Sequence, residues 1–320
     1  MRINRRFLYW GVFLVALGGV LVASDLRAVD EAMVADALRL WPLALVAIGV
    51  GLVLRRTQFS VPGGMLAAAV PGLVLGGAFV VTPNLALLCG PDREATNVAT
   101  SDGTFDGPAR ISVTAACGLV DIKTAPGNGW QFEASNAVDR PPSVDASSRT
   151  LSIEAGGGRG WRAFKSGGEE WHLTLPTSAI DDLSLEVNAG EGRISLPGAQ
   201  IGNLEVSTNA GQTTVDLSNA SVSSLTGEIN AGRLSFHLPA NADVVGSLEV
   251  NAGELQVCTP AGVGLRVRHD GALNGISING QHESDPDWQS QDYASAAHHA
   301  DLTVDVNLGN VSINPIGGCR

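Results

Sequence analysis

Basic residues are scarce over most of this 320-residue chain. Beyond Pro91 there are 13 Lys and Arg residues against 28 Asp and Glu residues. A surface of this sign repels phosphate backbones and anionic lipid headgroups. The composition therefore argues against nucleic acid as a partner, and against a C-terminal region that lies flat on a membrane. Most of this acidity serves solubility.

Cysteine is also rare, and its spacing excludes a zinc site, which requires pairs a few residues apart. The four residues are Cys89, Cys117, Cys258 and Cys319. Outside the cytoplasm they can form two disulfides, Cys89 with Cys117 and Cys258 with Cys319. Buried free thiols are an equal alternative.

Recognisable catalytic motifs are absent, because the sequence has neither a nucleophile elbow nor a Walker or dinucleotide-binding loop. A histidine-rich segment contains the potential metal ligands His282, Asp285, Asp287, His298 and His299. These residues have no fixed spacing and lie in an irregular polar stretch, which favours a solvated loop. We therefore predict a protein that is not an enzyme and has no catalytic residues, cofactor or metal.

The N-terminal region, residues 1–91, contains long uncharged runs that are typical of a membrane domain inserted in a lipid bilayer. We expect three transmembrane helices, at about residues 7–24, 40–54 and 64–82. A cleaved signal peptide at residues 1–24 is the competing interpretation. The arginines before the first run and at Arg55 and Arg56 predict a cytoplasmic N-terminus, and three spans would place the rest of the chain outside the cytoplasm.

An internal repeat is the strongest pattern in the sequence. Asn-Ala-Gly begins at Asn188, Asn209, Asn230 and Asn251, with the same interval of 21 residues each time. Apolar residues alternate before and after each triplet, as in Leu183, Leu185 and Val187, which is typical of strands with one buried face. One unit is therefore predicted to be a strand, an Asn-Ala-Gly corner, a second strand and a turn.

A single unit is too small to fold alone, so we expect the units to stack in parallel as a β-solenoid over residues 109–316, after a linker at 92–108. Equivalent residues would then form columns with a spacing of about 4.8 Å, whereas an antiparallel meander would separate them by about 9 to 10 Å. The expected structural corners, for which a ligand-binding row is the functional alternative, are Asn188, Gly190, Asn209, Gly211, Asn230, Gly232, Asn251 and Gly253.

Weaker copies of the pattern flank the repeat and are expected to cap its ends. They lie at Ile111–Ile122 and at Leu302–Ile313. A strand is also expected at Leu151–Glu154. The polar segment Gln281–Ala300 is interpreted as an insertion before the last coil.

Both regions resemble a known family. Leu40–Leu52 is similar to the membrane region shared by LiaI and LiaF proteins. Trp171–Pro176, the Asn-Ala-Gly repeats, Asp292–Ala297 and Leu308–Ile313 resemble the C-terminal toast-rack domain of LiaF-type cell-wall-active antibiotic response proteins. The family commonly has four spans, and this sequence shows three. The resemblance implies envelope-stress signalling, commonly by restraint of a membrane histidine kinase.

Two hypotheses about function follow. In the first, the chain is a non-enzymatic protein of the bacterial cell envelope that senses envelope stress or modulates signalling through a membrane histidine kinase. In the second, it is a membrane-anchored structural or adhesin-like module whose β-solenoid is displayed on the surface. The oligomeric state and the signal are not specified by either.

Overall fold

A computed structural model describes residues 5–25, 41–54, 60–81, 97–136, 141–156, 169–178, 180–270 and 274–319. The chain forms two compact units, Met1–Pro83 and Asn84–Arg320. In the described residues the first unit is helical and the second is almost entirely β.

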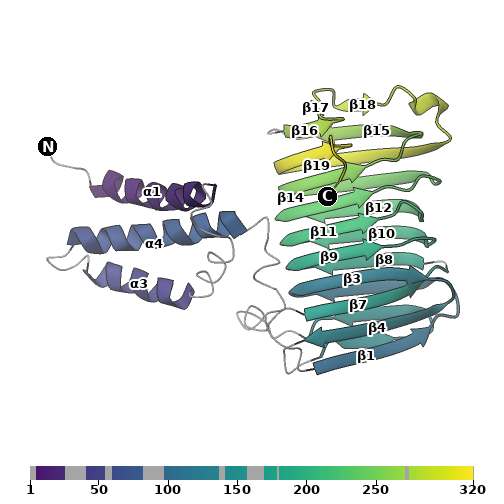
Figure 1. Ribbon diagram of the computed structural model, residues 1–320, viewed down its shortest axis with the longest axis horizontal. Coiled ribbons are helices and arrows are strands. Elements are labelled where there is room, and N and C mark those ends of the chain that lie inside the picture. Colours follow the sequence, from purple (N-terminus) through teal and green to yellow (C-terminus); the bar gives the residue numbers. More distant parts are fainter. Residues whose placement is uncertain are drawn as a thin grey trace. The chain divides into compact units, whose positions relative to one another are not determined.

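The N-terminal unit contains α1 (Arg5–Asp25), α3 (Trp41–Leu54) and α4 (Ser60–Val81), and α4 lies between the other two (Figure 1). Glycine lets α1 and α4 approach closely, because a Cβ atom at Gly72 would lie 2.5 Å from the backbone oxygen of Phe13. A Cβ atom at Gly64 would collide with the ring of Tyr9. The small residues therefore act as packing surfaces within this unit.

The helices overlap the three expected spans, but among the described residues none is both long and apolar enough to cross a membrane. The expectation of three transmembrane helices is therefore wrong. Helix α3, for example, has 14 residues, or about 21 Å at 1.5 Å per residue, against about 30 Å of hydrocarbon. The fold class is corrected to a mostly β chain with short helices in its N-terminal unit.

The strands of the C-terminal unit form two ladders on opposite sides of one stack (Figure 1). In spatial order, the first ladder contains β5 (Ser143–Ala146), β6 (Thr150–Glu154), β2 (Ala109–Ala115), β8 (Ile180–Val187), β10 (Gln200–Thr208), β12 (Ser221–Ile229), β14 (Val244–Cys258), β19 (His298–Ile313), β15 (Val263–Asp270) and β18 (Asp287–Gln289).

The second ladder contains, again in spatial order, β1 (Asn97–Thr104), β4 (Gly129–Asn136), β7 (Glu169–Pro176), β3 (Gly118–Ala125), β9 (Gly190–Ser195), β11 (Gly211–Asp216), β13 (Gly232–His237), β14, β19, β16 (Asn274–Ile278) and β17 (Gln281–His282). The long strands β14 and β19 run through the corner and belong to both ladders.

The pairing between repeats is parallel and in register. Leu204 of β10 pairs with Leu183 on one side and with Leu225 on the other. Val215 of β11 likewise lies between Ile194 and Phe236. Each residue therefore pairs with its equivalent in the next 21-residue unit, which is the parallel stack that the repeat predicts and not the meander.

The core fills the space between the two ladders, and its side chains compensate for one another in size. Phe236 is fully buried, and the neighbouring inward position is Gly227, where a Cβ atom would lie 2.8 Å from the Phe236 ring. Two polar residues satisfy each other across the core, because the Thr208 and Thr213 hydroxyl groups are hydrogen-bonded at 2.8 Å. The interior is thus closely packed even where the repeat varies.

The ends of the stack depart from the repeat. Strand β1 lies inside the expected 92–108 linker, so that linker is wrong for residues 97–104. The β1 sequence lacks apolar alternation, and the strand is held in the sheet by antiparallel backbone pairing with β4. The strand expected at Leu151–Glu154 is present as β6. The Gln281–Ala300 insertion contains β17, β18 and a 3-10 helix, η2 (Tyr293–Ser295), before β19.

Candidate functional site: the corner column and the acidic face

The asparagines of the repeat form a hydrogen-bonded ladder along one edge of the β unit. The Nδ2 atom of Asn209 donates to Oδ1 of Asn188 at 2.8 Å, and Asn230 donates to Asn209 at 2.7 Å. The Nδ2 atom of Asn251 in turn donates to Oδ1 of Asn230 at 2.9 Å. At the lower end, Asn188 donates to the backbone oxygen of Ala115 at 3.1 Å.

The ladder extends beyond the four predicted triplets. Asn307 donates to Asn251 at 2.8 Å, although its coil reads Asn-Leu-Gly rather than Asn-Ala-Gly. Its spacing from Asn251 is also lengthened by the insertion before β19. The Asn-Ala-Gly pattern did not predict this corner; the signal in the sequence that marks it is the Asn307 and Gly309 pair beside an alternating strand.

The glycines form a second column beside the asparagines. Gly190, Gly211 and Gly232 have positive φ values of 119°, 136° and 118°. A Cβ atom at any of them would collide with the backbone of the preceding glycine in the column, and the same holds for Gly253. Only glycine fits this corner, because it tolerates both the backbone angle and the close approach of the next coil.

The structure thus brings all eight predicted corner residues into one place, with their polar groups turned toward each other. The amide groups donate to neighbouring asparagines, and Asn209 and Asn230 also donate to Glu186 and Glu228 at 3.1 and 3.0 Å. These hydrogen bonds occupy the side-chain amide groups that a bound ligand would need. The arrangement therefore stabilises the fold along the stack.

The first ladder presents an acidic face, defined here as the outward side of β8, β10, β12, Val244–Val250 of β14 and Ala300–Val306 of β19. No Lys or Arg occurs in these segments. The outward carboxylates are Asp182, Glu186, Glu205, Glu228, Glu249, Asp301 and Asp305. Among described ion pairs, only Arg110 with Asp182, at 3.2 Å, involves this face.

The two sides of the stack differ in exposure. Glu205, Thr226, Ser247, Glu249 and Thr303 of the acidic face are all exposed. On the opposite side, by contrast, the outward positions occupied by Ser235 and Gln256 are buried. The acidic face is therefore the more open of the two surfaces.

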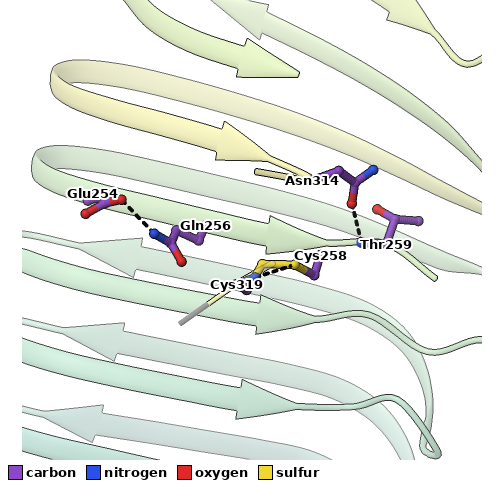
Figure 2. The surroundings of a disulfide bond; sticks show 6 residues. All are labelled: Glu254, Gln256, Cys258, Thr259, Asn314 and Cys319. Carbon is purple, nitrogen blue, oxygen red and sulfur yellow. Dashed lines mark hydrogen bonds between the residues drawn. A yellow bond between two sulfur atoms is a disulfide. The ribbon is translucent and has the colours of Figure 1, made fainter. Parts of the chain in front are cut away.

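A disulfide joins Cys258 to Cys319 across a sequence separation of 61 residues (Figure 2). The backbone amide of Cys319 also donates to the Cys258 sulfur atom at 3.0 Å, and Asn314 accepts from the Thr259 amide at 2.7 Å. This pairing confirms one of the two disulfides that the sequence left open. Cys117 is disulfide-bonded as well, whereas Cys89 lies outside the described residues.

Glu169 lies at the N-terminal end of the glycine column, next to Gly118. It pairs in register with Gly118, and its side chain is buried. Burial raises the pKa of this carboxyl to about 7, and the nearby indole of Trp171 offsets only part of that rise. Within the described residues, neither Oε2 of Glu169 nor Nε1 of Trp171 has a partner in hydrogen-bonding geometry. No sequence motif pointed to this group.

The histidine pair lies at the start of β19. The Nδ1 atoms of His298 and His299 are each 3.7 Å from Oδ1 of Asp243, and the Tyr293 hydroxyl donates to Asp301 at 2.9 Å. In the described part of the chain, no three His, Cys, Asp or Glu residues are grouped so that they could hold a metal ion. These contacts attach the insertion to the stack.

Residues 134–236 match the family Toast_rack_N, described as the N-terminal domain of toast_rack, DUF2154. A toast-rack N-terminal domain is therefore present. It extends from the end of β4 to Phe236 in β13 and so includes the first three Asn-Ala-Gly corners. A search of curated proteins finds no match to the sequence.

A comparison with solved structures finds matches over about two thirds of this chain. A candidate cell adhesion protein from Clostridium sporogenes ATCC 15579 is 14% identical with a TM-score of 0.44, and the match covers 68% of this chain and 100% of that one. A candidate adhesin from Bacteroides fragilis NCTC 9343 is 12% identical with a TM-score of 0.32, covering 69% and 98%. Similarity at this level carries no argument about function.

Proposed function

We propose that this chain is a non-enzymatic protein of the bacterial cell envelope, and that its toast-rack β unit works outside the cytoplasm as a rigid interaction module. In this proposal the module restrains or modulates a membrane histidine kinase during envelope stress. The observation that carries it is the acidic face, an open surface without Lys or Arg on five adjacent strands.

The chemistry of the acidic face suits a protein partner. Parallel strands place its carboxylates and hydroxyls in rows about 4.8 Å apart on a flat, stiff support. Such a surface attracts a basic segment and orients it before contact. The Cys258–Cys319 disulfide supports an oxidising compartment, because disulfides persist outside the cytoplasm.

Charge reversal on this face tests the proposal. Glu205→Lys combined with Glu249→Lys changes two exposed residues in β10 and β14. Asp145→Lys combined with Asp285→Lys makes the same charge change at exposed positions outside the face. Each tagged full-length protein would be purified from the envelope of its own cells, with an envelope-stress reporter measured in parallel.

A histidine kinase should co-purify with the wild type and the control pair, and its recovery should fall at least tenfold with the acidic-face pair. The stress reporter should change in the same variant. Absence of any kinase from the wild-type complex would overturn the signalling role. Loss of cell attachment to surfaces without a change in the reporter would instead support the adhesin-like function.

A further inference from the structure

In the described residues the β unit has four sheet edges, two at each end of the stack, and three of them are short. At the C-terminal end, β17 has two residues and β18 has three. At the N-terminal end, β5 has four residues and follows Pro141-Pro142. Short strands and proline are common protection against unwanted strand pairing. Strand β1 has eight residues and contains neither proline nor a basic residue.

Only one side of β1 is paired in the described structure, by β4. The next residue, Phe105, donates its amide to the Asn128 oxygen at 2.9 Å in the same register. Bonded and non-bonded pairs alternate in antiparallel ladders. Gly103, Ser101 and Ala99 therefore bond to β4, whereas Val98, Thr100, Asp102 and Thr104 direct their amide and carbonyl groups to the open edge.

The side chains of β1 also allow a second strand to approach its open edge closely. Ala99, Ser101 and Gly103 face the core and are small and half-buried. Gly103 lies directly against the indole of buried Trp130. On the outer surface, Val98 is 63% exposed, and β-branched residues such as Val and Thr pack well in cross-strand pairs. The end of the core is thus covered by a thin strand that another strand could extend.

We propose that β1 pairs with β1 of a second copy of this chain, antiparallel about a twofold axis at Ser101. In this register Val98 lies opposite Thr104 of the second copy, and Thr100 lies opposite Asp102. All four of these residues point their backbone groups to the open edge, so the ladder continues without a break. An identical edge is complementary to itself only in such a twofold arrangement.

Charge is compatible with this register and makes it sensitive to salt. Asp102 is the only charged residue of β1, and it faces threonine rather than its own copy. The rest of the β unit is acidic in both copies, and this repulsion extends over about 8 Å at physiological ionic strength. Dimerisation through β1 should therefore become stronger as salt is added. Binding of a basic partner to the acidic face should instead become weaker.

The oligomeric state of the purified full-length protein tests the pairing. Ser101→Cys places a thiol on the twofold axis, and no described cysteine of the native chain is free. On air oxidation this variant should form a covalent dimer at least tenfold faster than Ser223→Cys, whose residue is exposed in β12, far from the edge. Equal rates for the two variants would overturn the proposal.

Proline substitution provides the second measurement. Thr100→Pro removes an amide that points to the open edge, so the fold should remain and sedimentation should show a monomer where the wild type is a dimer. A wild type that is monomeric, or a dimer that persists in Thr100→Pro, would each contradict the pairing. Kinase recovery is independent of these outcomes, so this inference and the proposed function fail separately.

Discussion

Between β8 and β14 the same residue types recur at every corner, whereas the two ends of the β unit depend on contacts that occur once. The central coils share one asparagine ladder and one glycine column. At the N-terminal end the packing depends on aromatic residues. The rings of Phe132 and Trp171 are T-shaped, with their centroids 5.4 Å apart. At the C-terminal end it depends on a disulfide and on the Arg266–Asp287 ion pair.

This difference follows from the number of neighbours. A central coil is covered on both sides by coils of the same sequence pattern, so one set of residues satisfies every interface. A terminal coil has one such neighbour and must close its other side by different means. Stability in the centre should therefore be shared among coils, while damage at an end should remain local.

The largest expected effect is in the central core. Phe236→Ala removes a fully buried ring that fills the space beside Gly227 and should lower the free energy of unfolding by about 3 to 5 kcal/mol. Urea denaturation followed by circular dichroism measures the loss. Thr226→Ala, at an exposed position of β12, is the control and should change stability by less than about 0.5 kcal/mol. A small effect of Phe236→Ala would mean that the core is loosely packed.

The glycine column should be almost as sensitive. Gly211→Ala combines an unfavourable φ of 136° with a collision against the Gly190 backbone, so we expect a loss of about 3 to 4 kcal/mol. The control is Gly198→Ala, the same substitution at a glycine with a φ of 74°. A Cβ atom there would lie 3.5 Å from the Thr177 side chain, so the variant should lose only about 1 kcal/mol. Equal losses in urea denaturation would show that the column does not constrain the corner.

The C-terminal end should respond locally. Cys258→Ser combined with Cys319→Ser removes the disulfide and should cost about 2 to 4 kcal/mol. Amide hydrogen exchange should accelerate in β15, β16 and β19 and change little in β8 to β11, because the disulfide spans only the last coils. Uniform acceleration across the stack would show that the ends and the centre unfold as one unit.

The N-terminal end should respond to pH through Glu169. Its pKa in the folded state, about 7, is above the ordinary value of 4.5, so folding is favoured when the carboxyl is protonated. The cost of the buried carboxylate appears as pH rises from 4.5 to about 7. Glu169→Gln should remove this trend and gain roughly 3 kcal/mol at most above pH 7. Chemical denaturation at several pH values, with Glu170→Gln as control, measures it.

The sequence predicted the regular part of the molecule well, because a fixed interval of 21 residues places like residues on like positions. The Asn188 to Asn251 interval alone located the corners and the parallel register. It could not reveal β1, which enters the sheet through backbone pairing, or Glu169, whose position in the glycine column depends on contacts distant in sequence. The uncharged N-terminal runs predicted helices, but apolar composition alone did not establish a membrane span.

The smallest effect concerns the asparagine ladder, where position in the stack should decide the outcome. Asn230→Ala removes the hydrogen bonds that Asn230 donates to Asn209 and Glu228, and the one that it accepts from Asn251. Asn307→Ala removes the side-chain hydrogen bond that Asn307 donates to Asn251. Water can replace part of this bonding at a half-buried edge, so we expect losses of about 1 to 2 and about 0.5 kcal/mol.

Coupling between neighbouring amides distinguishes a ladder from a row of independent corners. Asn209→Ala and Asn230→Ala share one bond of 2.7 Å, so the double variant should lose less than the two single losses added together. Asn209→Ala and Asn307→Ala share no bond and should add. A thermodynamic cycle from urea denaturation measures both pairs. Additivity in both would mean that each asparagine stabilises only its own coil, as the separate contacts at the ends do.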